Sequence, residues 1–494
     1  MGKVGFDNQK YLNLQSEQIR KRIAQFGGKL YLEFGGKLFD DYHASRVLPG
    51  FEPDSKIRML QQLQKEVEIV ITISAEDIEA NKTRSDIGIT YDSDVLRLID
   101  TFRDLGLYVG SVVLTRYNSQ PNAKAFLNHL TSLGIKCYRH YTIAGYPSDI
   151  PHILSENGLG KNEYIETERS LIVITAPGPG SGKMATCLSQ LYHDHKRGIN
   201  AGYAKFETFP VWNLPLKHPV NLAYEAATAD LDDVNMIDPF HLEAYGKTAV
   251  NYNRDVEIFP VLNTIFERIQ GCSPYKSPTD MGVNMAGFCI FDDDACCTAS
   301  KFEIIRRYYA VASKAFKGRC DEAQPKKIEL LMNQAGISPE YCPAVPAALK
   351  KAEETGQPAG AILLPNGKIV TGKTSSTLGA ASALILNALK VLGNIDDSLD
   401  LIEAKVLEPI CNLKTSYLQH KNPRLHTDEV LLALTISALS NPVSESATKE
   451  LKNLRGSDAH FSVILSEEDE KILKRLGVNV SFEPRYETNK LYQK

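Results

Sequence analysis

A glycine-rich segment that ends in a lysine is the strongest chemical signal in this sequence. It reads Pro-Gly-Pro-Gly-Ser-Gly-Lys and ends at Lys183. Glycine accepts left-handed backbone conformations and leaves room beside the chain, so successive N–H groups can converge on one phosphate. We expect Gly178, Gly180, Ser181 and Gly182 to bind phosphate through the loop. Lys183 is expected to neutralise the outer phosphates at a helix N-terminus and is a candidate catalytic residue.

Two residues of this segment depart from the usual phosphate-loop pattern. Pro177 stands where the first glycine belongs, and Met184 replaces the hydroxyl residue that normally binds magnesium. Thr186 follows two positions later, about 200° around a helix, and is not an equivalent magnesium ligand. We keep Thr186 among the candidate cofactor-binding residues and expect other side chains to hold any magnesium ion.

Carboxylates further along the chain are candidates for that role. Asp292 and Asp293 follow the apolar run Phe-Cys-Ile-Phe, an arrangement that resembles the strand and acid that hold magnesium in phosphate-loop enzymes. Asp293 or the neighbouring Asp294 would equally cap the helix that follows. Glu207 stands at the end of the next expected strand, where ligands of doubly wound sheets bind, and is a candidate ligand or catalytic base.

The same glycines allow a second interpretation, the binding of a dinucleotide. Glu207 is placed where an acid that binds the ribose would be expected. The fingerprint G-x-G-x-x-G, however, needs a glycine where Lys183 stands. An NAD(P)-dependent oxidoreductase is therefore an alternative to a nucleotide- or phosphate-binding protein.

The formal phosphate-loop pattern G-x-x-x-x-G-K-[ST] matches elsewhere, from Gly367 to Thr374. Residues 368–371 favour a strand and follow a Pro-Asn-Gly turn, so this segment predicts the second arm of a β-hairpin. We expect no phosphate loop there.

The elements around the first loop predict an α/β fold. Strand-like runs alternate with helical patterns from residue 30 to residue 211, which is typical of a mostly parallel sheet covered by helices. A buried strand at 170–176, the loop and a helix from Met184 arrive in the order that a phosphate loop requires. The expected strands lie at 31–34, 68–74, 108–117, 136–143, 170–176 and 202–209.

The rest of the chain changes pattern twice. Strand signals fade after about residue 220, and stretches such as 256–269 and 301–316 have helical spacing. The mixed pattern returns near residue 323, after a charged passage that contains glycine and proline. We therefore expect an α/β domain at 1–219, a mostly helical domain at 220–322 and a second α/β domain at 323–494.

Composition narrows the class of protein. The 494 residues carry a net charge of −4, so the chain lacks the positive field of a basic nucleic-acid binder. No apolar leader and no stretch long enough to span a membrane are evident. Nine scattered cysteines without a CxxC pair fit reduced thiols. These features predict a cytoplasmic protein without nucleic-acid or membrane partners.

Three passages identify a resemblance to a known family: FGGKL with DDYHASRVLPG, the segment APGPGSGKMATCLSQLYHDHKRG, and AILLPNGKIVTGKTSSTLGAAS. They resemble the bacterial family called domain of unknown function 1846, over essentially the whole chain. The resemblance implies an amino-terminal α/β part, a helical part and a carboxy-terminal α/β part. It carries over no catalytic residue.

The leading hypothesis is a protein that binds a nucleotide or another phosphorylated ligand, with an ATP- and magnesium-dependent phosphotransferase or NTPase as its enzymatic form. The alternative that Met184 favours is a non-catalytic phosphometabolite-binding or assembly protein. The chain length and the apolar helices near the carboxy terminus are compatible with a homo-oligomer.

Overall fold

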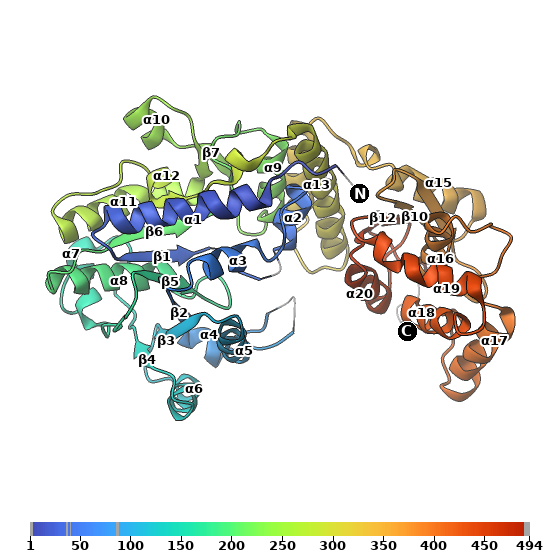
Figure 1. The fold of residues 1–494 in the computed structure, drawn as a ribbon, viewed down its shortest axis with the longest axis horizontal. Coiled ribbons are helices and arrows are strands. Elements are labelled where there is room, and N and C mark those ends of the chain that lie inside the picture. Colours follow the sequence, from blue (N-terminus) through green and yellow to red (C-terminus); the bar gives the residue numbers. More distant parts are fainter. Residues whose placement is uncertain (1–2, 36–37, 40, 85–87, 489–494) are drawn as a thin grey trace. The chain divides into compact units, whose positions relative to one another are not determined.

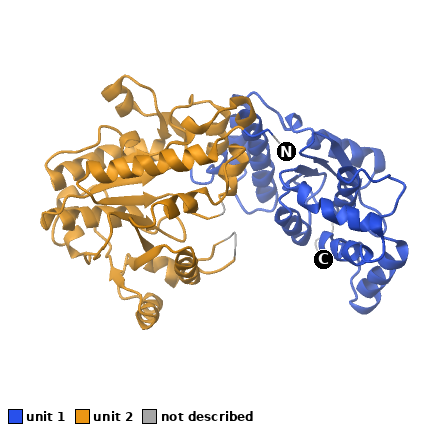
Figure 2. Ribbon diagram, in the orientation of Figure 1, with its two compact units in different colours: residues 1–4, 226–232, 297–494 blue, residues 5–225, 233–296 orange. Residues whose placement is uncertain are grey.

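The computed structural model describes residues 3–35, 38–39, 41–84 and 88–488. The chain divides into two compact units (Figure 2). Residues 5–225 and 233–296 form the first, which we call the N-terminal unit. Residues 1–4, 226–232 and 297–494 form the second, the C-terminal unit. The boundaries between the three domains expected from the sequence stay predictions.

The N-terminal unit is built on a seven-stranded parallel sheet with the order β4-β3-β2-β5-β1-β6-β9 (Figure 1). Three of its inner strands, at 67–74, 108–115 and 171–175, are rich in β-branched residues, as expected of a sheet that helices cover on both faces. The predicted α/β class is confirmed. The strands are β1 (Leu30–Phe34), β2 (Val67–Ser74), β3 (Tyr108–Thr115), β4 (Cys137–Arg139), β5 (Leu171–Thr175), β6 (Gly202–Phe206) and β9 (Gly282–Val283).

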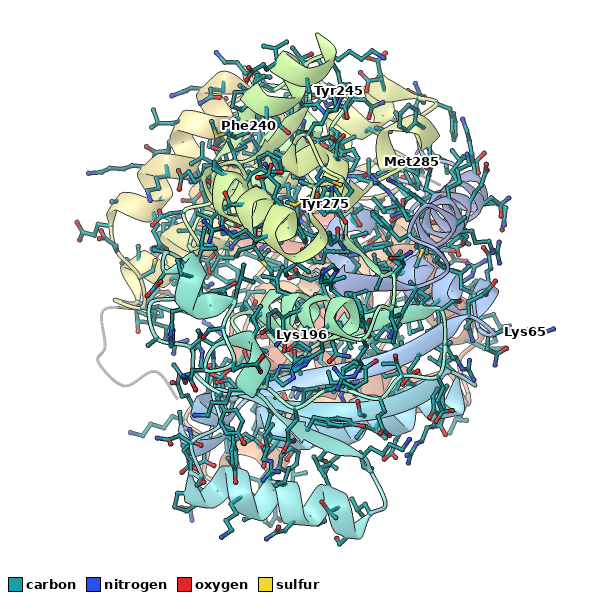
Figure 3. The ribbon with its side chains drawn as sticks, turned by 90° about the vertical axis from the view of Figure 1, so that its left-hand side faces the viewer. Lys65, Lys196, Phe240, Tyr245, Tyr275 and Met285 are labelled. Carbon is teal, nitrogen blue, oxygen red and sulfur yellow. The ribbon has the colours of Figure 1, made fainter. Side chains whose placement is uncertain are left out.

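The connections between parallel strands are right-handed, and this handedness determines which face of the sheet each helix covers. The first face carries α1 (Asn8–Gln25), α2 (Tyr42–Val47), α3 (Ser55–Gln62), α4 (Ala75–Glu79), α5 (Tyr91–Asp104) and α6 (Pro121–Ser132). The second face carries α7 (Ile150–Ile153), α8 (Lys183–Lys196) and α11 (Asn253–Gln270). Tyr275 and Phe240 lie in the helical layer of this second face (Figure 3).

The connections that leave the neighbouring strands β5 and β1 run in opposite directions along the sheet, which makes this the switch point of the sheet. From β1 the chain crosses to β2 on one side, and from β5 it crosses to β6 on the other. The loops that follow these two neighbouring strands therefore diverge to opposite faces. In open α/β sheets, ligands bind in the crevice that such a divergence leaves at the carboxyl ends of the strands.

The segment expected to be helical contains short strands as well. The helical stretches at 256–269 and 301–316 lie within α11 and α13 (Asp293–Phe316), as predicted. The shorter elements of this segment are α9 (Pro219–Ala227), β7 (Asn235–Ile237), α10 (Pro239–Tyr245), β8 (Val250–Tyr252), α12 (Pro278–Met281) and η2 (Ala286–Cys289). A further short helix, η1 (Leu159–Lys161), lies earlier in the chain, before β5. The strands β7, β8 and β9 have two or three residues each, too few for a periodic signal.

The C-terminal unit has its own four-stranded mixed sheet, with the order β11-β10-β12-β13. Its strands are β10 (Ala359–Leu363), β11 (Ile369–Lys373), β12 (Asp458–Phe461) and β13 (Asn479–Phe482). Its helices, besides most of α13, are α14 (Ala323–Gln334), η3 (Pro339–Tyr341), α15 (Ala344–Thr355), α16 (Ala380–Leu392), α17 (Ala404–Asn412), η4 (Leu413–Tyr417), α18 (Thr427–Ser437), α19 (Pro442–Lys449), η5 (Glu450–Leu454) and α20 (Glu467–Arg475).

The segment that matches the formal phosphate-loop pattern is a hairpin arm, as predicted. Strands β10 and β11 pair in antiparallel fashion, with Gly360 opposite Gly372. A Cβ atom on Gly372 would lie 2.4 Å from the backbone nitrogen of Leu384 in α16. The glycine is therefore explained by the close approach of this helix and not by an anion.

Candidate phosphate site

The glycine-rich loop connects β5 to α8 at the carboxyl edge of the sheet, beside the switch point. The predicted order of strand, loop and helix is confirmed. Gly180 and Gly182 have φ angles of 75° and 83°, in the left-handed region that favours glycine. Gly182 is the residue that directly precedes α8.

Side chains from neighbouring elements hold the loop in place. The hydroxyl of Ser181 donates to the carbonyl of Gly178 at 2.8 Å, and Thr115 Oγ1 donates to the carbonyl of Ser181 at 2.8 Å. Gly178 packs so closely on Tyr91 that a Cβ atom there would lie 2.2 Å from the phenol oxygen. The loop conformation is thus set by β3 and α5, and two of its carbonyl groups already accept hydrogen bonds.

The backbone amides of the loop are left without acceptors. Among the residues that the structure describes, no oxygen accepts from the N–H groups of Gly178, Gly180, Ser181, Gly182 or Lys183. Successive N–H groups around glycines of positive φ form a concave site for anions, and the dipole of α8 adds to the attraction. These are the residues that the sequence assigned to phosphate.

Lys183, the first residue of α8, is a lysine without a counter-ion. It is half-buried, and its ammonium forms no ion pair with any described residue. Burial lowers the pKa of Lys183, and the nearby carboxylate of Glu33 only partly opposes this effect. A half-buried ammonium with a lowered pKa would be stabilised by an incoming anion.

A buried cluster of charged side chains lies on the same face of the sheet as α8. Glu33 near the end of β1 pairs in register with Lys205 of β6, and the hydroxyl of Tyr203 donates to Glu33 Oε2 at 2.7 Å. The ammonium of Lys205 binds Glu207 Oε1 at 2.8 Å and also binds Asp255. Although burial opposes it, these two carboxylates raise the pKa of Lys205.

Glu207, the candidate ligand or base, is therefore a member of a buried ion pair. Burial raises the pKa of Glu207, and Lys205 acts in the opposite direction. The carboxylate lies at the carboxyl edge of the sheet, as expected from its place after β6. Its pairing with Lys205 leaves Glu33 as the carboxylate whose charge acts most strongly on Lys183, without forming an ion pair with it.

The other predicted site residues have different surroundings. Thr186 is buried, with its hydroxyl 3.4 Å from Nδ1 of His140. Asp292 Oδ1 accepts the N–H of Ala295 at 3.0 Å, which caps the start of α13. Asp293 lies 3.1 Å from Nε2 of His218. Metal binding by the two aspartates stays a prediction.

Sequence reasoning missed Glu33, Lys205 and Asp255. The sequence around each of these three residues contains a weak indication of a polar cluster. Glu33 and Lys205 are charged residues inside otherwise apolar strand runs, and Asp255 opens a helix. A charge inside a buried strand needs a partner, so the amino-acid pattern by itself can indicate a buried polar cluster.

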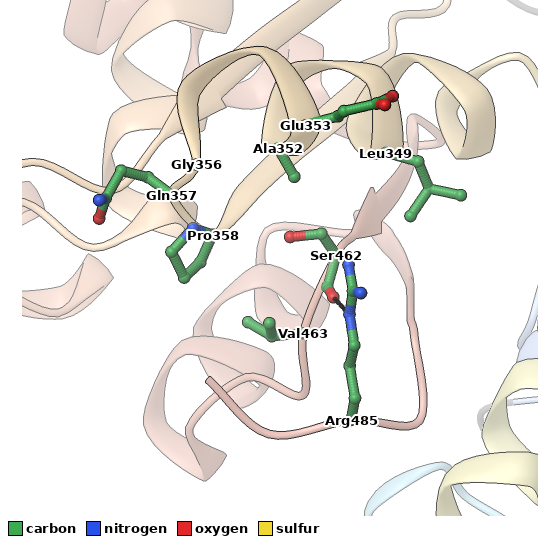
Figure 4. Close-up of a pocket in the computed structure, with 9 residues that line it drawn as sticks. All are labelled: Leu349, Ala352, Glu353, Gly356, Gln357, Pro358, Ser462, Val463 and Arg485. Carbon is green, nitrogen blue, oxygen red and sulfur yellow. Dashed lines mark hydrogen bonds between the residues drawn. The ribbon is translucent and has the colours of Figure 1, made fainter. Parts of the chain in front are cut away.

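Two hollows lie outside this site. One, of about 440 Å³, lies in the N-terminal unit at the far end of α8, where Tyr192 and Lys196 line it. The other, of about 430 Å³, lies in the C-terminal unit beside the ends of β12 and β13 (Figure 4). There, Arg485 Nε donates to the carbonyl of Ser462 at 2.6 Å. Neither hollow is lined by the glycine-rich loop.

Comparisons with known proteins match the whole length of the chain. Residues 4–336 match the N-terminal model of "Domain of unknown function DUF1846", and residues 340–492 match its C-terminal model. Proteins named UPF0371 from Streptococcus pyogenes serotype M5 and from Streptococcus uberis are each 60% identical over 494 residues, with 100% of both chains covered. No helix among the described residues is long and apolar enough to cross a membrane.

Proposed function

Because the chain belongs to the bacterial DUF1846 family, whose description states no function, we propose a function from its own site: the binding of a phosphorylated small molecule by the loop from Gly178 to Lys183. One observation carries the proposal. The loop combines a row of unpartnered amides with a lysine that has no counter-ion. Amide groups at a helix start that no side chain caps can bind an anion, and a half-buried ammonium beside them favours an anionic ligand.

The position of the loop supports a ligand larger than inorganic phosphate. The amides lie at the switch point of the sheet, where doubly wound proteins bind nucleotides and related molecules. We therefore expect the phosphate chain to occupy the loop and the remainder of the ligand to extend over the carboxyl ends of β5 and β1. ATP is the first ligand to test.

Phosphoryl transfer from the bound ligand is the more specific form of the proposal, and three features bear on it. Glu33 is a carboxylate beside Lys183, which a magnesium-dependent transfer would use. Met184 offers no hydroxyl for the metal, and Glu207 is already paired with Lys205. These last two features favour binding without transfer as the second candidate function.

Calorimetry with a matched pair of lysine variants tests the proposal. Lys183 and Lys373 both follow a glycine, but Lys373 ends a hairpin strand. We expect tripolyphosphate or ATP to bind the parent protein and Lys373→Ala equally, and Lys183→Ala at least about tenfold more weakly. Equal binding by Lys183→Ala would contradict the proposal. Stabilisation by NAD(P) and not by ATP in a thermal-shift assay would favour the oxidoreductase alternative.

A further inference from the structure

The outer face of α18 in the C-terminal unit is apolar. Its inner side packs in the core through Val430, Ala433 and Leu434. On the opposite side, Leu432 is 66% exposed, Ile436 is 57% exposed, and Leu439, just beyond the helix, is 87% exposed. Their spacing of four and three residues puts them on one stripe, where a surface helix normally carries polar residues.

The segment before α18 exposes more apolar surface. Helix α17 packs against α18 and continues into η4. Leu413, Tyr417 and Leu418 in and after η4 are each at least 50% exposed. Segment η4 lies against the start of α18, where Lys414 binds Glu429 at 2.7 Å. We call the six exposed side chains in and just after η4 and α18 together the hairpin patch. Patches of this kind on soluble proteins commonly mark interaction sites.

The area of the hairpin patch matches what one subunit contributes to a dimer. The apolar area of a fully exposed side chain is about 100 Å² for leucine or isoleucine and about 200 Å² for tyrosine. Multiplied by the exposed fractions of the six side chains, these areas give roughly 500 Å² of exposed apolar surface. A standard interface takes about 800 Å² from each partner, and about 65% of it is apolar in homodimers, which is again roughly 500 Å².

The chemistry of the patch favours a second copy over a membrane surface. The fifteen residues from Val430 to Ser444 contain no charged side chain, and none from Thr427 to Asn441 is lysine or arginine. Helices that bind anionic membranes carry basic residues beside the apolar face, whereas interface cores are depleted in charge. The stripe is also symmetric, with leucines at both ends and Ile436 between them.

We propose that the hairpin patch is the dimer interface between two copies of this chain. The two α18 helices pack in antiparallel fashion about a two-fold axis near Ile436. In this arrangement Leu432 meets Leu439 of the partner subunit, so the same residues serve both copies. The interface is independent of the phosphate site and of any ligand bound there.

Light scattering coupled to size-exclusion chromatography tests this proposal on the full chain. We expect the parent protein to elute with twice the mass of one chain at about 10 μM, since stable homodimers bind well below that concentration. Ile436→Glu would place two like charges together at the axis and should give a monomer, with dissociation at least about 100-fold easier. Leu330→Glu is the matched control, because Leu330 is 62% exposed on α14 and lies outside the hairpin patch. It should remain a dimer.

Circular dichroism melting separates loss of association from loss of folding, because a folded Ile436→Glu monomer keeps the helical spectrum of the parent. A parent protein that is monomeric at that concentration would overturn the proposal, as would a folded Ile436→Glu protein that stays dimeric. Vesicles of phosphatidylcholine and phosphatidylserine provide the remaining outcome. If the parent protein is monomeric and floats with these vesicles, and Ile436→Glu does not, the patch binds membranes and the dimer proposal is refuted.

Discussion

Replacing Lys183 with methionine should make the protein more stable and, at the same time, a weaker binder of phosphates. Methionine has a similar length but no charge. The ammonium of Lys183 is held half-buried without a counter-ion, and its burial outweighs the attraction of Glu33. Removing the charge therefore relieves a desolvation penalty in the folded state. It also removes the one cation that lies within the loop.

The sign of the stability effect follows from the lowered pKa. A lysine whose pKa is lower in the folded than in the unfolded protein disfavours folding at every pH where the unfolded lysine is protonated. The penalty is complete below the folded pKa, shrinks as the pH rises above it, and disappears above the ordinary value of about 10.4. The advantage of Lys183→Met over the parent should therefore be largest near neutral pH and fall as the solution becomes alkaline.

The loss of binding can be given a magnitude. A hydrogen bond to a charged group contributes about 1.5–3 kcal/mol, which corresponds to a roughly 10- to 150-fold change in the dissociation constant. We expect the affinity of Lys183→Met for tripolyphosphate to fall within that range. Binding to the parent protein should also be accompanied by proton uptake at alkaline pH, because a bound phosphate raises the pKa of Lys183 again.

Two measurements check these expectations. Thermal melting of both proteins from about pH 7 to pH 10 gives the stability difference, with Lys373→Met as a control for the loss of an exposed charge. Titration calorimetry in buffers of different ionisation enthalpy gives the proton uptake. A Lys183→Met protein that melts below the parent at neutral pH, or that binds tripolyphosphate with equal affinity, would refute the reasoning.

Three further predictions concern other parts of the chain. Gly178→Ala would bring a Cβ atom to 2.2 Å from the phenol oxygen of Tyr91, and the overpacking should lower stability by about 1–3 kcal/mol in a melting experiment and weaken phosphate binding. The hydrogen bond and charge of Asp469 raise the pKa of His426, so His426→Gln should lose more stability at about pH 5.5, below the ordinary imidazole pKa, than at an alkaline pH above the raised pKa, where the folded parent no longer carries the proton. Leu384→Ala, at a fully buried position, should cost about 2–5 kcal/mol in the urea-induced unfolding of the C-terminal unit.

Each of these has an outcome that would count against it. Unchanged melting of Gly178→Ala would mean that the loop relaxes freely and is not held by Tyr91. A loss of stability in His426→Gln that does not depend on pH would assign the imidazole a packing role alone. A cost below about 1 kcal/mol for Leu384→Ala would indicate that the surrounding helices collapse into the space.

The elements that the sequence predicted well are those with a strong local cause. The run Val67–Ser74 is a strand because β-branched residues favour a pleated, fully buried environment. The arm Ile369–Lys373 follows from its Pro-Asn-Gly turn. By contrast, β9 has two residues, and its place beside β6 depends on contacts far apart in the sequence.

The same distinction applies to the site. The loop at Gly178–Lys183 could be recognised because glycines, lysine and flanking elements occur together in the chain. Glu33 could not be assigned, because it lies 150 residues before Lys183 and reaches the site only through the pairing of β1 with β5. The aspartates at 292 and 293 had a suggestive local pattern, and a helix start explains that pattern equally well.

The insertion of β5 between β2 and β1 has a consequence for how this protein emerges from the ribosome. The first four strands cannot form a continuous sheet, because β1 and β2 are joined only through β5, whose residues 171–175 are synthesised later. Until β5 is available, β1 and the edge of β2 remain unpaired in the nascent chain, and unpaired strand edges favour aggregation. The strand that joins β1 to β2 also carries the glycine-rich loop, so the loop and the central part of the sheet form from the same segment.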